Sequence, residues 1–119
     1  MQPVAQFKEV MRLISEYKLA RAEAVCLELL SPAPADINLS ALLGAILLKG
    51  DRLGEAESIL LDVTRTAPTF AKPHQDLAIL YANRKYYLAA AKYFRLATEI
   101  DPQLAAAFSG LSHVLGRLG

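Results

Sequence analysis

The stretch AKPHQDLAILYANRKYYLAAAKYFRLATEIDPQL, residues 71–104, decides the fold. In its first half, Leu77 and Tyr81 stand four residues apart, which places both side chains on one face of a helix. In its second half, Ala90 and Phe94 have the same spacing and mark the face of a second helix. Polar residues separate the two halves, so the stretch predicts two helices joined by a short turn.

The chain repeats this pattern at a constant interval, which we call the repeat period. Three prolines keep the interval, because 68 − 34 = 34 and 102 − 68 = 34: Pro34, Pro68 and Pro102. Three alanines keep the same interval: Ala22, Ala56 and Ala90. A period of about 34 residues indicates stacked helix pairs, so we predict an all-α fold.

The repeated residues resemble the tetratricopeptide repeat, whose pattern is aromatic-x-x-Leu-Gly-x-x-Tyr followed by Ala, Phe, Ala and Pro. The stretch 37–70 matches this pattern with Leu43, Gly44, Leu47, Ala56, Leu60 and Pro68. The resemblance covers almost the whole chain and implies a right-handed superhelical solenoid of antiparallel helix pairs. It divides a single domain, 1–119, into repeats at about 3–36, 37–70 and 71–104 and a half repeat at 105–119, with about seven helices in all.

Local signals mark the predicted helix boundaries. Proline cannot occupy a helix interior, so each of the three periodic prolines separates one helix pair from the next. Gly50 and Asp51 supply the turn within the second repeat. Three polar residues precede first helices and are expected to cap them: Asp36, Thr69 and Asp101.

The first repeat is less regular than the others. A strict period would place Gln6 and Glu9 in the core of its first helix, where burial of polar side chains is costly. A shift of one residue instead points four apolar side chains inward: Phe7, Val10, Met11 and Ile14. We therefore predict the shifted register, with a turn one residue shorter near Tyr17 and Lys18.

The last predicted helix has an apolar stripe and no partner helix after it. The stripe consists of Phe108, Leu111, Leu115 and Leu118. Terminal repeats usually show a polar outer face, so we predict that the chain is the N-terminal fragment of a longer protein. The alternative is a natural end, with the last helix solvated or covered by self-association through this C-terminal helix.

Composition excludes several classes of function. The formal charge of +1 shows no excess of basic residues of the kind that marks a nucleic-acid binder. A single cysteine, Cys26, rules out an internal disulfide framework. The N-terminus has no secretory signature and no stretch is apolar enough to span a membrane, so we expect a cytoplasmic protein.

In proteins with this repeat, the first helix of each pair lines a concave groove in which ligands lie. Transferring the lining positions to this chain assigns a peptide-binding groove to Lys8, Arg12, Asn38, Ala41, Ala45, Lys49, Lys72, Gln75, Ile79, Asn83, Ser109, His113 and Arg117. Small side chains at Ala41 and Ala45 would leave room in the groove, and Ile79 would give it an apolar floor. Amide groups such as that of Asn83 pair with a peptide backbone.

Some members of the family clamp the C-terminal carboxylates of heat-shock chaperones with cations and amides. The matching positions here hold Lys8, Arg12, Leu42, Lys72 and Asp76. Leu42 removes an amide, and Asp76 puts a negative charge where a carboxylate would bind. We therefore expect no chaperone-tail binding.

No motif in the chain indicates catalysis, and we expect neither a cofactor nor a metal. There is no glycine-rich phosphate loop and no nucleophile elbow. His74 and His113 are far apart and lack neighbouring cysteines or paired carboxylates, which argues against zinc. Cys26 replaces a large core residue and is expected to be a buried, inert thiol.

The leading interpretation is a protein-protein interaction scaffold, not itself an enzyme, that binds a protein or peptide in its groove. The alternative is an N-terminal regulatory or substrate-presenting repeat domain of a larger enzyme such as a sulfotransferase or a glycosyltransferase. That alternative is an analogy at the level of the fold, prompted by the alanine-rich, bacterial-looking repeats. The identity of the ligand does not follow from the sequence.

Overall fold

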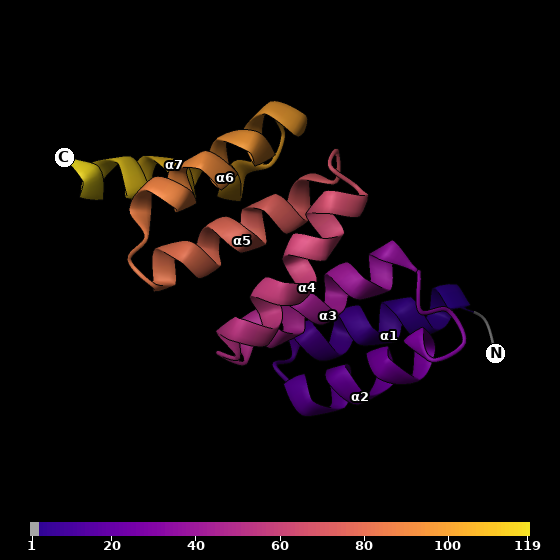
Figure 1. The fold of residues 1–119 in the computed structure, drawn as a ribbon. Coiled ribbons are helices and arrows are strands. Elements are labelled where there is room, and N and C mark those ends of the chain that lie inside the picture. The colour runs from indigo at the N-terminus through magenta and orange to yellow at the C-terminus, as the bar shows by residue number, and fades with distance from the viewer. Residues whose placement is uncertain (1–2) are drawn as a thin grey trace. The chain divides into compact units, whose positions relative to one another are not determined.

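A computed structural model describes residues 3–119, with side chains from residue 6 onward, and over this range the chain forms seven helices (Figure 1). They are α1 (Pro3–Ser15), α2 (Leu19–Leu30), α3 (Ile37–Lys49), α4 (Leu53–Thr66), α5 (Ala71–Asn83), α6 (Tyr87–Ile100) and α7 (Ala105–Leu118). Within each of the runs α1–α3 and α5–α7, consecutive helices pack against each other, and the predicted all-α architecture is confirmed. Within residues 3–119, no helix is both long enough and apolar enough to cross a lipid bilayer.

The chain divides into two compact parts, which we call the N-terminal unit (Met1–Ile59) and the C-terminal unit (Leu60–Gly119). In the N-terminal unit, α2 packs against both α1 and α3. In the C-terminal unit, α6 packs against both α5 and α7, and α7 also contacts α5. Each unit therefore contains three consecutive helices around its own core, and α4 begins in one unit and ends in the other.

The periodic small residues are among the most deeply buried positions of the second helices. Ala22, Ala56 and Ala90 are each 0% exposed. One turn later, the register-equivalent side chains are also buried: Cys26, Leu60 and Phe94. A small residue beside a larger one lets two helices approach closely while the space between them is filled, so the repeat in sequence is a repeat in packing.

The turn inside each helix pair also recurs at the repeat period. Tyr17, Asp51 and Lys85 have φ values of 58°, 63° and 65°, in the left-handed region. In each case the next residue donates its N–H to a carbonyl five residues earlier: Lys18 to Leu13 at 2.8 Å, Arg52 to Leu47 at 2.9 Å and Tyr86 to Tyr81 at 2.8 Å. This is the hydrogen bond of a Schellman motif. The predicted shorter turn in the first repeat is therefore wrong.

The register of α1 is the strict one, and the predicted shift is wrong. Val10 and Leu13 are 0% and 2% exposed, whereas Met11 is 49% exposed. Phe7 and Ile14 are only half-buried. The strict register does not bury Glu9 in the core, because that side chain stays 40% exposed and pairs with Arg12. The charge of Glu9 therefore remains in contact with water.

Only one of the three predicted caps is present. The Asp36 carboxylate accepts a hydrogen bond from the Leu39 N–H at 3.1 Å and caps α3. The capping positions one and two periods later are Phe70 and Leu104, whose side chains have no acceptor. Thr69 therefore lies one residue too early, and Asp101 instead accepts the Gln103 N–H at 3.0 Å in the preceding turn.

Candidate functional site

The predicted ligand residues of the C-terminal unit form a row of three register-equivalent pairs on α5 and α7. Since α6 runs antiparallel to both helices, α5 and α7 are parallel, and they are in contact. Positions one repeat period apart form the pairs Gln75 with Ser109, Ile79 with His113, and Asn83 with Arg117. Asn83 and the three α7 residues are exposed, Ile79 is half-buried and Gln75 is 5% exposed. We call this set the α5–α7 row.

Lys72, which precedes the row on α5, is already engaged with a carboxylate of the protein. Its Nζ lies 3.0 Å from Oδ1 of Asp76, one helical turn away. The Asp76 side chain is only 5% exposed, and the pairing with Lys72 helps to offset its burial. The negative charge of Asp76 therefore lies beside the cation that a ligand carboxylate would approach, and the absence of chaperone-tail binding stays a prediction.

Behind the row, aromatic side chains pack between the helices of the C-terminal unit. Tyr81 stacks on Tyr93 with ring centroids 5.6 Å apart, and His74 lies on Tyr93 at 6.1 Å. His74 Nε2 donates to the Pro68 carbonyl oxygen at 2.9 Å. These rings therefore have packing roles. Among the described residues, His74 Nδ1 and Gln75 Oε1 are buried polar atoms without a hydrogen-bond partner.

The predicted residues on α3 have unequal access to solvent. Asn38 and Lys49 are exposed and Ala45 is half-buried, but Ala41 is 8% exposed. The small side chain of Ala41 is thus covered and leaves no open space at that position. The Lys49 carbonyl accepts a hydrogen bond from the Tyr17 hydroxyl at 2.9 Å, which ties the end of α3 to the α1–α2 turn.

The predicted residues on α1, Lys8 and Arg12, are both exposed, but their assignment depends on the shifted register. In the strict register, the positions one repeat period before Ala41 and Ala45 are Phe7 and Met11. The constant repeat period of the sequence identifies these two positions. The predicted one-residue shift assigns Lys8 and Arg12 in their place. Phe7 and Met11 therefore join the candidate ligand-facing residues of the N-terminal unit.

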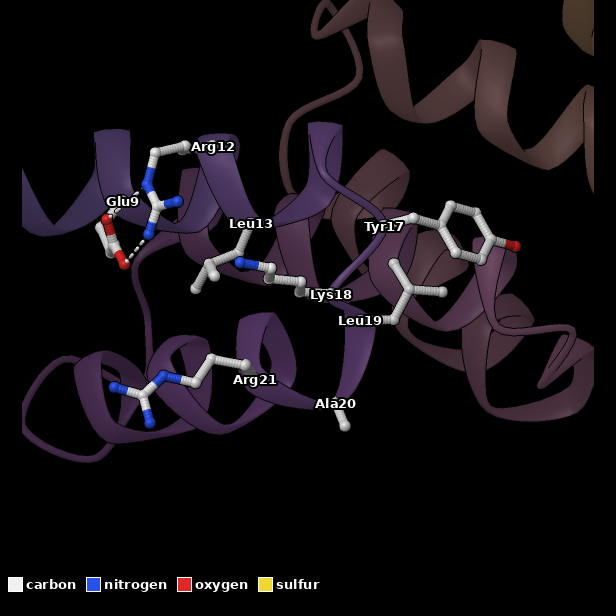
Figure 2. Close-up of a pocket in the computed structure, with 8 residues that line it drawn as sticks. All are labelled: Glu9, Arg12, Leu13, Tyr17, Lys18, Leu19, Ala20 and Arg21. Carbon is white, nitrogen blue, oxygen red and sulfur yellow. Dashed lines mark hydrogen bonds and ion pairs between the residues drawn. The ribbon is translucent and has the colours of Figure 1, made fainter.

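A cavity of about 690 Å³ lies between α1 and α2, and Figure 2 shows the side chains around it. Arg12, Lys18 and Arg21 contribute three cations to its lining. Arg12 donates to both carboxylate oxygens of Glu9, at 3.0 and 2.6 Å, and also pairs with Glu16. Lys18 pairs with Glu16 as well, at 3.0 Å. Two of the three cations are therefore already neutralised inside the protein, so this cavity is a weak candidate for an anion.

Hydrogen bonds from these cations lower the pKa values of both carboxyl groups. The hydrogen bond from Arg12 is the main cause for Glu9, whose pKa lies below its ordinary value. For Glu16, the hydrogen bond from Lys18 comes first and that from Arg12 second, and the pKa is again lowered. The charged forms are thus the ones that the folded chain stabilises.

A second cavity, of about 510 Å³, lies where α1, the end of α2 and the start of α3 meet. It is lined by Gln6, Phe7, Leu29, Pro32, Ala33, Asp36, Asn38 and Leu39. Its walls are mainly apolar and it includes both Asn38, a predicted ligand residue, and Phe7, which the strict register adds. We call it the Phe7 cavity.

The described part of the chain offers no group of three or more His, Cys, Asp or Glu side chains suited to a metal ion. Cys26 is 0% exposed, and its Sγ donates to the Leu39 carbonyl at 3.3 Å. Burial raises the pKa of this thiol to about 11. A protonated, covered thiol is a poor nucleophile, which agrees with the expected inert role.

Known structures share this arrangement of helices, and the chain has the tetratricopeptide-repeat fold. No protein-family model matches the sequence, and no curated protein matches it either. A solved structure of MamA from Desulfovibrio magneticus RS-1 is 22% identical, with a TM-score of 0.81 over 98% of this chain and 66% of that one. The chain therefore spans slightly less than two thirds of the MamA chain.

Two shorter domains are covered more completely. The tetratricopeptide-repeat domain of Sgt2 from Aspergillus fumigatus is 16% identical, with a TM-score of 0.88 over 98% of this chain and 80% of that one. The first such domain of Spaghetti (RPAP3), solved with an HSP90 peptide, is 13% identical, with a TM-score of 0.85 over 97% and 91% of the two chains. At these identities, the similarity shows the fold alone.

Proposed function

We propose that this chain is a non-catalytic protein-interaction module that binds a peptide or a helix on the first helices of its pairs. In the C-terminal unit, the ligand would lie along the α5–α7 row. The proposal is supported by the fold, since the similar domain of Spaghetti was solved with a peptide bound. The partner's identity is left to experiment.

The observation that carries the proposal is the chemical mixture along the α5–α7 row. Ile79 presents a half-buried apolar surface, and the exposed side chains of Asn83 and His113 flank it. An apolar contact with a few polar groups beside it is the usual composition of a peptide site.

The test is to select binders from a displayed library of random dodecapeptides and measure the affinity of the best one for variants. Asn83→Ala combined with His113→Ala removes two exposed side chains of the row, so the fold should be kept. We expect a loss of affinity of about tenfold, as at typical interface residues. Lys92→Ala with Arg95→Ala on α6 is the control, because both side chains are exposed and lie outside the row. Equal affinity of both double variants would refute the site.

A second candidate function, self-association, is favoured by the exposed apolar stripe of α7. Phe108, Leu115 and Leu118 are 47%, 40% and 43% exposed and lie on one face of the helix. Contiguous apolar surface of this kind marks interaction sites, and a second copy of the chain would bring the same stripe. Sedimentation velocity should show a mass that rises with concentration, and Phe108→Gln with Leu115→Gln should abolish the rise. A monomer at all concentrations excludes this function.

A further inference from the structure

The Phe7 cavity has the size and walls of a site for one bulky apolar side chain. Its volume of about 510 Å³ lies within the usual range of ligand pockets, about 300–1,000 Å³. Leu39 is 7% exposed and forms a fixed wall, while Phe7 and Leu29 are half-buried and still present apolar surface to the cavity. Covering this surface with an apolar group would release the water that now contacts it.

The wall of the cavity at the start of α3 carries a fixed negative charge. Asp36 is exposed, and its Oδ1 is held in place by the Leu39 N–H at 3.1 Å. The partial positive charge at the N-terminus of a helix is about half an elementary charge, so the full negative charge of the carboxylate outweighs it. The cavity therefore favours a cation over an anion beside the apolar group.

Asn38 gives the same edge of the cavity a neutral polar group. Its side chain is exposed at the second position of α3, next to Leu39. An amide offers both donors and an acceptor, which is what an extended peptide backbone requires. The cavity thus combines an apolar recess, a backbone-pairing group and a negative charge.

We propose that the Phe7 cavity binds an aromatic or large aliphatic side chain of a peptide in which the adjacent residue is basic. The inference rests on the proposed function, since it names the ligand chemistry that the N-terminal unit would select. The site lies wholly within that unit and is separate from the α5–α7 row.

Three short peptides probe this chemistry directly: N-acetyl-tryptophanyl-lysine amide, N-acetyl-tryptophanyl-glutamate amide and N-acetyl-alanyl-lysine amide. Their binding to the full chain is followed by chemical-shift changes of backbone amides near the cavity, such as those of Asn38 and Leu39. We expect the tryptophanyl-lysine peptide to bind most tightly, about threefold better than its glutamate counterpart, because an exposed charge contributes modestly. The alanyl peptide should cause no saturable shift.

Three variants test the location and the charge preference of the site. Ala33→Trp should fill the cavity and weaken binding of the tryptophanyl-lysine peptide by about tenfold. The loop should keep its conformation, because the backbone N–H and carbonyl of residue 33 keep their turn hydrogen bonds. Ala35→Trp is the matched control, because Ala35 is exposed on the same loop and outside the lining. Asp36→Asn keeps a residue that caps well but removes the charge, so the preference for lysine over glutamate should disappear.

Three results would overturn the inference: equal binding of the tryptophanyl and alanyl peptides, equal binding of the lysine and glutamate peptides, or equal loss in the two tryptophan variants. None of these results affects the binding test of the α5–α7 row, because the residues substituted in that test, Asn83 and His113, belong to the C-terminal unit. Conversely, loss of row binding leaves the shifts at Asn38 and Leu39 as an independent measurement.

Discussion

The exposed faces of the first helix, α1, and the last described helix, α7, carry different kinds of side chain. On α1, Arg12 occupies the position at which the next two repeats bury Ile46 (2% exposed) and Leu80 (0%). It is 49% exposed and pairs with two glutamates. On α7, Leu111 and Leu115 stand one repeat period after Leu77 and Tyr81 and keep the apolar character of the repeat, yet Leu115 is 40% exposed.

The difference shows that the period identifies equivalent positions without saying whether a neighbour covers them. On α1 the sequence has replaced an apolar residue by an ion-paired cation, so exposure costs little. On α7 the sequence keeps the apolar residues of a covered helix, and Phe108, Leu115 and Leu118 are exposed in the described chain. Substitutions on each side of the two helices test this contrast.

The largest effect is expected from the buried side of α1. Leu13→Ala removes a side chain that is 2% exposed and should lower the free energy of unfolding by about 2–5 kcal/mol. Met11→Ala, on the 49% exposed side, should cost much less. Urea denaturation of both variants measures the difference. If Met11→Ala were the more destabilising change, α1 would have the shifted register after all.

The buried side of α7 is tested by its glycines. A Cβ on Gly110 would lie 2.3 Å from Cζ of Phe94, a ring that is itself buried at 3% exposure and cannot move away freely. Gly110→Ala should therefore destabilise the protein by about 1–3 kcal/mol. At Gly116 no atom lies within 4 Å, so Gly116→Ala should stabilise α7 by about 0.5–1 kcal/mol through helix propensity. Thermal unfolding of the pair should shift in opposite directions, and two shifts of the same sign would contradict the packing of α7 on Phe94.

The second helices of the pairs and the first helix, α1, together show how far the sequence determines the structure. Ala22, Ala56 and Ala90 fall at the same place in each pair because close packing of two helices accepts only a small side chain there. That requirement is local, so the period predicts it. The register of α1 is not predicted in the same way, because the cost of placing Glu9 depends on whether anything covers that side of the helix.

The candidate site was predictable only in part, for a related reason. The α5–α7 row follows from the period, since residues one period apart on parallel helices lie side by side. The repeat period does not predict the ion pair between Lys72 and Asp76, because pairing of side chains one helical turn apart depends on how deeply the carboxylate is buried. The Phe7 cavity involves three helices and a loop, and no single periodicity describes such a junction.

A smaller effect is expected at the turns, where the two units differ in one contact. Lys85 adopts φ = 65° with an exposed side chain, and relief of this left-handed conformation by Lys85→Gly should stabilise the protein by up to about 1 kcal/mol. The same change at Tyr17 also removes the hydrogen bond from its hydroxyl to the Lys49 carbonyl, so the gain should shrink or reverse. Lys85→Ala is the control and should be close to neutral, and thermal unfolding compares the three variants. Equal gains at both turns would mean that the tyrosine hydroxyl contributes nothing.

The smallest effect is expected from the charges on the exposed side of α1, and its sign follows from the pKa values. Hydrogen bonds from Arg12 and Lys18 hold the pKa values of Glu9 and Glu16 below the ordinary value of 4.5 in the folded chain. Unfolding restores the ordinary values, so below about pH 5 the unfolded chain binds more protons than the folded one. The stabilisation from these pairs is therefore complete above that pH and is lost as the pH falls further.

Arg12→Gln removes the shared cation and should make the free energy of unfolding fall less steeply between pH 5 and pH 3 than in the unmodified protein. High salt should reduce the difference between the two proteins, because exposed ion pairs are screened. Arg117→Gln on α7 is the matched control, since Arg117 forms no ion pair within the described residues and its loss should leave the slope unchanged. If Arg12→Gln and the unmodified protein gave parallel curves, the ion pairs of α1 would contribute nothing to stability, and the contrast with α7 would be one of side-chain chemistry alone.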